Sequence, residues 1–543
     1  MNLNLYDGYT WRQVVHGVWQ RDVDEAEQSY TSLIRYYSGS GRMQFAITGH
    51  ITLTVPTDDT ETPEETAAYF DKSLRAAWLR LRYENPTIAS RVLVDPYIGR
   101  WQKRYETVPD QAAQEAWLER TFQTVCNGQN GAEWANSDPP APLEATLFVV
   151  KPPSGISFGE EGIVRRDLVL RSPHDIIDGI GTLQLFDNFI SLVLRAVAQG
   201  PEYSPPALDS SETSRLSPPF RVAAGVPPTP TPTQQQRLVE LEKAREAPLF
   251  DGVLDVGIPF RQGQLVPGKH QRVARTISPA RAAQLLSTVK SFGATVTHAF
   301  HAAIAMAIRD IHAETSNAGR DAAVVRYSNY ILRNERPRCS FPFNTPRHAA
   351  AVYHSVSGER LAVEMTASPS PNQLEEFSRI LIKMRDYYHS VRDDPDHYAL
   401  APTIWSGFTP PVSLPTEDPN KETPPVPPPN PKPSVSLSSM GVVDRIISPE
   451  RGGISMYNPW VTGEELGTGL GLFLGSFRGE LCLSAAFNEA WHTREEVDGF
   501  LERCERIVFA WVDGLAQYGG FLGRHGLGSS VIYRSAAPIY LRR

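Results

Sequence analysis

One short segment of this sequence, residues 172–179, combines residue types that could catalyse proton transfer. Its histidine, His174, stands four residues before Asp178, and Gly179 follows directly. A neutral imidazole titrates close to physiological pH and can remove a proton from a hydroxyl while that oxygen attacks an acyl carbon. The pattern therefore predicts His174 as a general base. An ordinary polar loop after a strand explains six residues of this kind equally well.

The elements around this segment are expected to hold the histidine rigidly. The apolar run 168–170 predicts the end of a strand before it, and the amphipathic pattern 183–197 predicts a helix after it. A side chain at such a junction lies at the end of a sheet, where a reactant can reach it. We expect Asp178 to bond local backbone or an arginine as a structural brace. Gly179 would allow a tight turn or the close approach of another segment.

The pattern H-x-x-x-D-G resembles the core motif of a large acyltransferase superfamily. This superfamily includes chloramphenicol acetyltransferase, the plant BAHD enzymes and the condensation domains of nonribosomal peptide synthetases. There the histidine is the general base and the aspartate is mainly structural, which implies these roles for His174 and Asp178. Condensation domains usually carry a second histidine before the catalytic one, where this chain has Pro173. This departure argues against an enzyme that forms peptide bonds.

A closer resemblance, to the trichothecene 15-O-acetyltransferases of filamentous fungi, extends over nearly the whole chain. The segments that carry it are GVW (17–19), FAITGH (45–50), WANSDPP (134–140), SSMGVVD (438–444) and NPWVTGEELG (458–467). The resemblance implies acetyl transfer from acetyl-CoA to the C-15 hydroxyl of a sesquiterpenoid alcohol, with no metal and no covalent enzyme intermediate. It also implies an α/β (α+β) fold. Two lobes with mixed sheets, like those of chloramphenicol acetyltransferase, would be related by a pseudo-twofold axis, with His174 in a tunnel between them.

Size and composition describe an ordinary globular protein. The chain has 543 residues, of which 41% are hydrophobic and 21% charged, and this length favours two or three domains. The 53 basic and 61 acidic residues give a net charge of -8, whereas a nucleic-acid partner would call for a basic face. The four cysteines form no CxxC pair, so we expect reduced thiols and neither a zinc site nor a disulfide framework.

The first residues lack the basic flank and apolar core of a signal peptide, and we expect no run to reach the apolar length that a bilayer needs. We therefore expect a cytoplasmic monomer without a membrane span or a nucleic-acid partner, acting on a small molecule.

Composition divides the chain into three parts. We expect an N-terminal lobe at 1–200 that carries the histidine motif, a linker rich in proline at 201–236, and a C-terminal lobe at 237–543 with a proline-rich loop at 409–433. Apolar periodicity predicts helices at 63–83, 295–311 and 493–515, and strands at 88–94, 147–150, 163–170, 324–332, 361–365 and 434–443. Residues 470–477 and 481–487 are predicted to form a hairpin across Arg478 and Gly479.

Several other residues are candidates for the site. Ser438 and Ser439 would lie where a strand of the second lobe enters the shared site, and a hydroxyl there could donate to the oxyanion; ordinary strand packing explains them equally well. Two basic clusters could meet the phosphates of the coenzyme, although solvated loops explain them about as well. The residues concerned are Lys269, Arg272, Arg336 and Arg338.

Two further patterns could indicate a metal site or a serine hydrolase, but their context does not support either function. His298 and His301 are three residues apart in a helical pattern, but no third metal ligand stands out, so we expect core or tunnel-lining side chains. The GxSxG pattern at 155–159 lacks the flanking strand and helix of a serine hydrolase. Two rival functions stay open: a condensation-type acyltransferase that takes its acyl group from a carrier protein, and a noncatalytic protein that binds a terpenoid or an acyl-CoA on the same scaffold.

Overall fold

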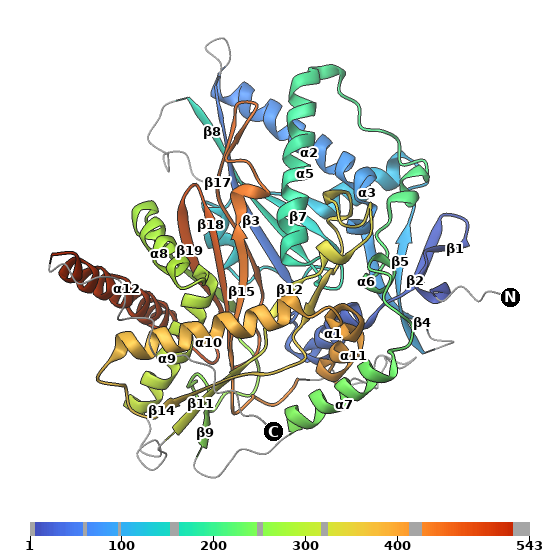
Figure 1. The fold of residues 1–543 in the computed structure, drawn as a ribbon. Coiled ribbons are helices and arrows are strands. Elements are labelled where there is room, and N and C mark those ends of the chain that lie inside the picture. The colour runs from blue at the N-terminus through green and yellow to red at the C-terminus, as the bar shows by residue number, and fades with distance from the viewer. Residues whose placement is uncertain are drawn as a thin grey trace.

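Two large mixed β-sheets, each covered by helices, organise the chain (Figure 1). The computed structural model describes residues 6–57, 62–95, 99–151, 162–246, 253–315, 324–411 and 426–524. The GxSxG pattern at 155–159 and most of the proline-rich loop at 409–433 lie outside these residues. The sheets combine parallel and antiparallel pairs, so the predicted α/β class with mixed sheets is confirmed.

The first sheet has six strands and carries the histidine motif at the end of one of them. Its order is β16 (Glu450–Arg451), β17 (Ile454–Gly463), β3 (Ile47–Pro56), β8 (Ile163–Ser172), β7 (Thr146–Val150) and β6 (Phe122–Val125). Helices α2 (Pro63–Glu84) and α5 (Gly179–Gln199) lie side by side across one face, where Phe70, Trp78, Phe186 and Phe189 pack into one core cluster. The predicted helix at 63–83 is confirmed, and its start has the capping box of Thr62 and Glu65 with Pro63 in the first turn.

The second sheet has four strands and a separate core. Its order is β10 (His270–Ile277), β19 (Glu480–Asn488), β18 (Leu470–Phe477) and β15 (Val435–Val442). Helices α8 (Pro279–Ser291), α9 (Val296–Thr315) and α12 (Arg494–Arg524) pack against this sheet, and α10 (Gln373–Asp393) packs on α9 and α12. Strands β18 and β19 form the predicted hairpin, and Arg478 and Gly479 both have positive φ, as a two-residue turn of type I′ requires.

The remaining elements surround these two sheets. A further sheet joins β1 (Arg12–Val15), β2 (Val18–Asp22), β5 (Arg100–Glu106) and β4 (Ser90–Asp95). Two small sheets join β14 (Leu361–Thr366), β11 (Val324–Asn329) and β9 (Val253–Val256), and β12 (Leu332–Asn334) with β13 (His354–Val356). The other helices are α1 (Glu25–Tyr36), α3 (Gln111–Thr121), α4 (Gly131–Ala135), α6 (Phe220–Ala223), α7 (Pro232–Glu246) and α11 (His397–Phe408). The predicted strand 324–332 is divided between β11 and β12.

The two halves of the chain exchange an element. Strand β17 follows β15 in sequence, yet it pairs with β3 in the six-stranded sheet, and its Met456 and Val461 lie in the core of that first sheet. The predicted lobe boundaries at 200 and 236 stay predictions. Between them the structure has short helices, including α6 and the start of α7, joined by irregular chain.

Helix α5 corrects one expectation. Among the described residues it is long and apolar enough to cross a membrane by length and composition, although no such run was expected. However, 56% of its most apolar window is buried inside the protein, and Leu183, Phe186 and Ile190 pack in the first core. Apolar residues on more than one face are typical of a helix buried between a sheet and other elements.

Candidate active site

His174 lies in a tight loop between the end of β8 and the start of α5. The loop closes on itself because the Ile176 backbone N–H donates to the Pro173 carbonyl at 3.2 Å. Ile176 and Ile177 are buried and anchor the loop in the interior, whereas His174 is half-buried. The predicted strand–helix junction is therefore present, with the imidazole at the end of the sheet.

The imidazole of His174 is enclosed on one side and open on another. The ring of Tyr30 from α1 stacks on it, with centroids 3.7 Å apart and planes 7° apart, and the ring of His354 from β13 lies 5.6 Å away. Nδ1 is buried without a hydrogen-bond partner of good geometry. No described residue hydrogen-bonds to Nε2, and that atom is not among the buried ones, so it faces the solvent-accessible side.

These surroundings keep His174 neutral. Burial, followed by the charge of His354, lowers the pKa of His174 to about 3, and the nearby Asp178 opposes this only in part. Burial penalises the charged form of an imidazole. A general base must be unprotonated before it accepts a proton, so the site holds the imidazole in the form that this role requires.

Asp178 makes both kinds of contact that a bracing aspartate was expected to make. Its carboxylate accepts from the Gly181 N–H at 2.7 Å, which caps α5, and from the Tyr353 N–H at 2.8 Å. Arg336 Nη1 donates to both carboxylate oxygens at 2.8 Å. Burial alone would raise the pKa of Asp178, but Arg336 and His354 hold it well below its usual range. Asp178 is therefore a buried anion that ties the loop to the other half of the chain.

Arg336 has a different place from the one expected. Its side chain is only 4% exposed and its guanidinium is directed at Asp178 and at the carbonyls of Ala349 and Ala351. A guanidinium enclosed in this way has no surface to offer the phosphates of a coenzyme. Its expected contact with the coenzyme is therefore corrected to an ion pair with Asp178.

The Met440 side chain approaches Gly179 closely. A Cβ at Gly179 would lie 3.2 Å from the terminal methyl carbon of Met440, which belongs to β15 of the second sheet. Of the two expected reasons for this glycine, the structure shows the close approach of another segment. Gly181 is more constrained, because a Cβ there would lie 2.2 Å from the Ala349 carbonyl oxygen and 2.7 Å from Arg336.

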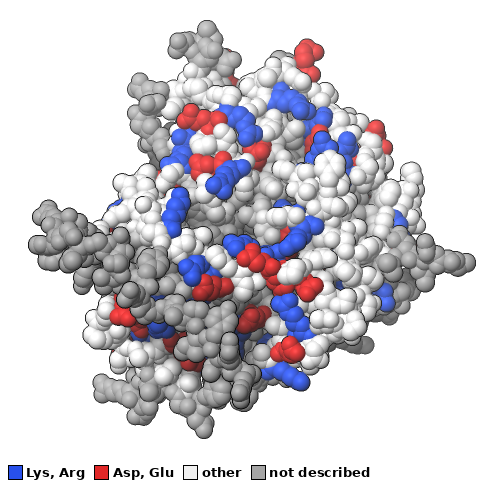
Figure 2. Space-filling view, viewed as in Figure 1, with Lys and Arg blue, Asp and Glu red and all other residues white. Residues whose placement is uncertain are grey.

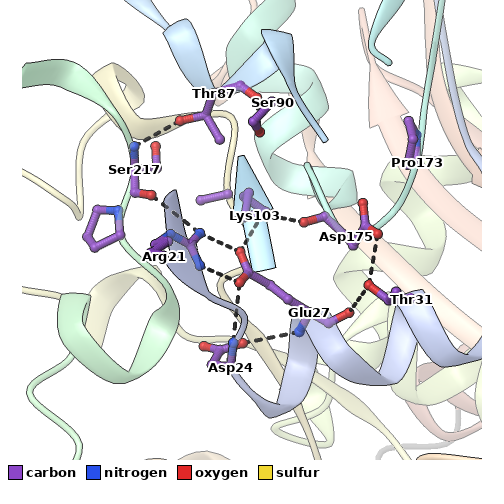
Figure 3. A network of polar contacts seen from close by, with 12 residues as sticks. Arg21, Asp24, Glu27, Thr31, Thr87, Ser90, Lys103, Pro173, Asp175 and Ser217 are labelled. Atoms are coloured by element: carbon purple, nitrogen blue, oxygen red, sulfur yellow. Dashed lines mark hydrogen bonds and ion pairs between the residues drawn. The ribbon is translucent and has the colours of Figure 1, made fainter. Parts of the chain in front are cut away.

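A buried charge network lies behind the histidine loop (Figure 3). Lys103 of β5 is fully buried, and its ammonium donates to the Asp175 carbonyl at 2.6 Å and to the Glu27 carboxylate at 2.5 Å. Thr31 donates to the Asp175 carboxylate at 2.9 Å, and Arg21 pairs with Glu27. Burial would raise the pKa of Glu27, but Arg21 and Lys103 lower it to about 2. Thr31 of α1 and Lys103 of β5 thus hold Asp175, the residue that follows His174.

Tyr30, Lys103 and His354 contact the motif or its loop, and sequence reasoning did not identify them. Tyr30 and His354 are 324 residues apart, yet the Tyr30 hydroxyl lies 2.8 Å from His354 Nε2. A buried lysine within the run RWQKRYE has no local signal that separates it from a surface lysine. Ala26, Tyr30, Leu33 and Ile34 follow helical spacing in α1, which could have indicated burial of Tyr30 but not which partner it meets.

The predicted oxyanion donors, Ser438 and Ser439, lie on β15. The next residue of this strand, Met440, contacts Gly179 of the histidine motif. Ser438 is half-buried, and Ser439 is exposed with its hydroxyl accepting from Thr297 of α9 at 2.9 Å. The structure therefore brings this strand to the motif through Met440, while an oxyanion role for either serine stays a prediction.

The remaining basic candidates differ in their surroundings. Lys269 and Arg338 are exposed. Arg272 is 9% exposed, and its guanidinium lies 4.2 Å from the centroid of the Trp460 ring. Its Nε is buried without a partner, and its hydrogen bond is to Cys482 Sγ at 3.8 Å, so no carboxylate neutralises it among the described residues. Arg272 is thus a buried cation that an anionic ligand could pair with.

The other predicted features have plain structural roles. His301 is buried and its ring nitrogens lie 2.8 Å and 3.1 Å from the hydroxyls of Tyr327 and Tyr388. The backbone N–H of Thr295 donates to His298 at the start of α9. Over the described ranges no three His, Cys, Asp or Glu side chains are grouped as a metal ion would require. The cysteines are free thiols.

A cavity of about 670 Å³ lies beside α1, lined in part by Gln28, Ser32, Trp101 and Ser406. Gln28 and Ser32 are four residues apart and share one face of α1. Tyr30 is two residues from each of them, which is slightly more than half a helical turn, so its side chain lies on the opposite face. This cavity is therefore separated from His174 by α1. The tunnel between two lobes stays a prediction.

Comparison with known proteins supports the expected relationship. No family model matches the chain. The O-acetyltransferase pigM of Monascus ruber is 26% identical over 512 residues, which cover 92% of this chain and 86% of that protein. The acetyltransferase pigO of the same organism is 22% identical over 505 residues, which cover 92% and 97%.

Solved structures show the same fold. The TRI3 trichothecene 15-O-acetyltransferase from Fusarium sporotrichioides matches with a TM-score of 0.73 and 16% identity, over 93% of this chain and 99% of that one. The first condensation domain of the calcium-dependent antibiotic synthetase matches with a TM-score of 0.56 and 14% identity, over 92% and 97%. The fold is therefore the one shared by this acetyltransferase and by condensation domains, and the relatives make an acyltransferase the enzyme class of this chain.

Proposed function

We propose that this chain is an O-acetyltransferase that moves an acetyl group from acetyl-CoA to a hydroxyl group of a secondary metabolite, with His174 as the general base. The observation that carries the proposal is the His174 imidazole, which is held neutral with Nε2 accessible and Nδ1 enclosed. The two acetyltransferase relatives from Monascus ruber support the same chemistry.

The reaction needs one proton acceptor and no covalent enzyme intermediate. His174 Nε2 takes the proton of the acceptor hydroxyl while the hydroxyl oxygen attacks the thioester carbon. The tetrahedral adduct then loses CoA thiolate as the C–S bond breaks, and the imidazolium returns its proton to the sulfur. Both substrates held beside one imidazole also gain from proximity, which supplies about 7–11 kcal/mol in well-oriented reactions.

For the acceptor we propose the C-15 hydroxyl of a trichothecene sesquiterpenoid. The fold match to the TRI3 trichothecene 15-O-acetyltransferase supports this acceptor.

For the coenzyme we propose Arg272 and Lys269 as the first candidates to meet its phosphates, with Arg338 as an exposed alternative. Arg272 lacks a carboxylate partner, and burying a cation without a counter-ion is costly unless a ligand supplies the negative charge. Ser438 and Ser439 remain candidates for the oxyanion.

The decisive experiment combines the purified protein with acetyl-CoA and a 15-hydroxy trichothecene, and follows free thiol and product mass. We expect His174→Ala to lower kcat by at least about 100-fold, the lower range for loss of a general base. His312→Ala, at the far end of α9, is the control and should leave kcat unchanged. A folded His174→Ala variant with near-normal transfer would refute the assignment, and a product acetylated elsewhere would refute only the C-15 acceptor.

The fold match to a condensation domain favours one second candidate, an acyltransferase that takes acetyl from a carrier protein. Supplying acetyl-CoA and acetyl-carrier separately distinguishes the two donors. Release of CoA thiol in the presence of the acceptor would also exclude a noncatalytic binding protein on the same scaffold.

A further inference from the structure

We propose that Tyr30 and His354 form a coupled pair that positions the catalytic imidazole: Tyr30 covers one face of His174, and His354 holds Tyr30 in place. Both are positioning residues for the reaction proposed above, on which this inference rests.

The Tyr30 ring is stacked tightly on the His174 imidazole. Ring centroids 3.7 Å apart with planes 7° apart leave no room for water on that face of the imidazole. The stacked ring defines the plane of His174, while Nδ1 is enclosed and Nε2 is left accessible. A catalytic group performs best when its side chain is locked by packing close to the productive geometry.

Tyr30 is in turn hydrogen-bonded to His354. Tyr30 is 6% exposed, so its hydroxyl needs a partner, and His354 Nε2 lies 2.8 Å from it. Burial and the charge of Asp178 both raise the pKa of Tyr30, so its hydroxyl stays protonated. Asp178 Oδ2 lies 3.7 Å from His354 Nδ1, too far for a hydrogen bond but close enough to favour the proton on Nδ1. The hydroxyl of Tyr30 then donates to Nε2 of His354.

His354 is itself anchored by the contacts of strand β13. The next residue of β13, Ser355, donates to the buried Glu335 carboxylate at 2.6 Å, and its hydroxyl lies 2.7 Å from His397 Nε2. Trp405 Nε1 donates to the His354 carbonyl at 3.3 Å. Strand β13 is therefore fixed on both sides, and it transmits that position through Tyr30 to His174.

The pair also explains why His174 is shielded. The titratable groups that face its ring are Tyr30 of α1, His354 of β13 and Asp178 at the start of α5. Burial is the largest cause of the lowered pKa of His174, and the Tyr30 ring covers a whole face. Removing this ring should let water reach the imidazole and return its pKa towards the ordinary value.

The test compares four single variants and the double variant that combines Tyr30→Phe with His354→Ala. Tyr30→Ala removes the stack, Tyr30→Phe keeps the ring and loses the hydroxyl, and His354→Ala removes the anchor. Tyr387→Phe is the matched control. The Tyr387 hydroxyl also has a side-chain hydrogen-bond partner, Ser357 at 2.7 Å, but the Tyr387 ring packs against the core of the second sheet.

We expect Tyr30→Ala to lower kcat by about 10-fold or more while KM for acetyl-CoA changes by less than about threefold, since ring orientation and not coenzyme binding is lost. Tyr30→Phe and His354→Ala should each lower kcat by roughly threefold, and the double variant should be no worse than His354→Ala, because one hydrogen bond is shared. Tyr387→Phe should match the wild type.

A second measurement does not depend on turnover. NMR of protein labelled with 13C at histidine Cε1 reports the titration of His174, whose resonance is the one absent from His174→Asn. We expect no titration of this resonance above pH 5 in the wild type or in Tyr30→Phe, and a midpoint nearer 6.5 in Tyr30→Ala. This result would stand even if the proposed acceptor were wrong.

Two outcomes would overturn the inference. Tyr30→Ala with wild-type kcat and an unchanged His174 titration would show that the stack positions nothing. Additive losses in the Tyr30→Phe, His354→Ala double variant would show that the two residues act separately. If Tyr30→Ala does not fold, this double-variant comparison decides the case by itself.

Discussion

Replacing Arg336 with methionine should reveal how strongly the buried ion pair holds the histidine loop. Arg336→Met keeps an apolar stem of similar length and leaves the Asp178 carboxylate with two backbone donors, Gly181 N–H at 2.7 Å and Tyr353 N–H at 2.8 Å. Breaking one side of a buried ion pair costs about 3–5 kcal/mol. Because the two N–H groups remain, we expect the lower end, about 3 kcal/mol, which is roughly 100-fold in the ratio of folded to unfolded protein.

The loss of stability in Arg336→Met should depend on pH, and the pKa of Asp178 determines the direction of that change. In the wild type the pKa of Asp178 is depressed, so the pair stabilises the fold above the unfolded pKa and is lost only as pH falls through the much lower folded value. Without Arg336, only His354 and the two backbone donors oppose burial, so we expect the pKa of Asp178 to rise and protonation to relieve the buried charge in acid. The deficit of Arg336→Met should therefore be largest near pH 7.5 and smaller near pH 5.

Urea unfolding followed by tryptophan fluorescence at these two pH values measures the deficit. Arg503→Met is the matched control, because Arg503 makes a two-point contact with Glu314 at 2.7 Å and 2.8 Å on an exposed surface. Exposed pairs contribute up to about 1 kcal/mol. Adding Asp178→Asn to Arg336→Met should recover part of the loss. A deficit for Arg336→Met no larger than that of the control, or one that grows in acid, would refute the reasoning.

Three further predictions concern the same site. Between pH 5 and 8 the kcat of the wild type should not follow protonation of His174, because a pKa of about 3 leaves it neutral there; an acid limb centred near 6.5 would contradict this burial. Lys103→Met should lower the free energy of unfolding by about 2 kcal/mol and slow transfer, since the Asp175 carbonyl loses its donor; unchanged values in both assays would contradict the bracing role. Arg272→Gln should raise KM for acetyl-CoA by about 10-fold with little change in kcat. The control is Arg275→Gln, because Arg275 lies on the other face of β10 and bonds Glu505 of α12, and its KM should not change. Equal KM values for the two variants would remove Arg272 from the coenzyme site.

Local features of the chain could be predicted because their causes are local. Thr62 and Glu65 mark the start of α2 through bonds within one turn, and Arg478 and Gly479 mark a hairpin through their own φ angles. His174 could be placed between a strand and a helix because apolar runs flank it on both sides. In each case the residues that decide the structure lie within a few positions of one another.

The partners of the site residues could not be predicted, because the folded path of the chain brings them together. In the sequence, Arg336 is one of several basic residues in a predicted loop. In the folded chain it binds Asp178, which lies 158 positions away. Strand β17 leaves its own half of the sequence and pairs with β3, a choice that depends on which sheet has an open edge and a matching apolar face.

Residue types and spacing were thus enough to place His174 between a strand and a helix and to expect Asp178 as a brace, whereas the class of fold came from the resemblance to known acyltransferases. Tertiary packing alone determined that Tyr30 covers the imidazole, that His354 anchors Tyr30 and that Arg336 is enclosed. The reason is physical: stacking, burial and ion pairing act over a few ångströms in space, and separation along the chain carries almost no information about that distance once the chain has folded.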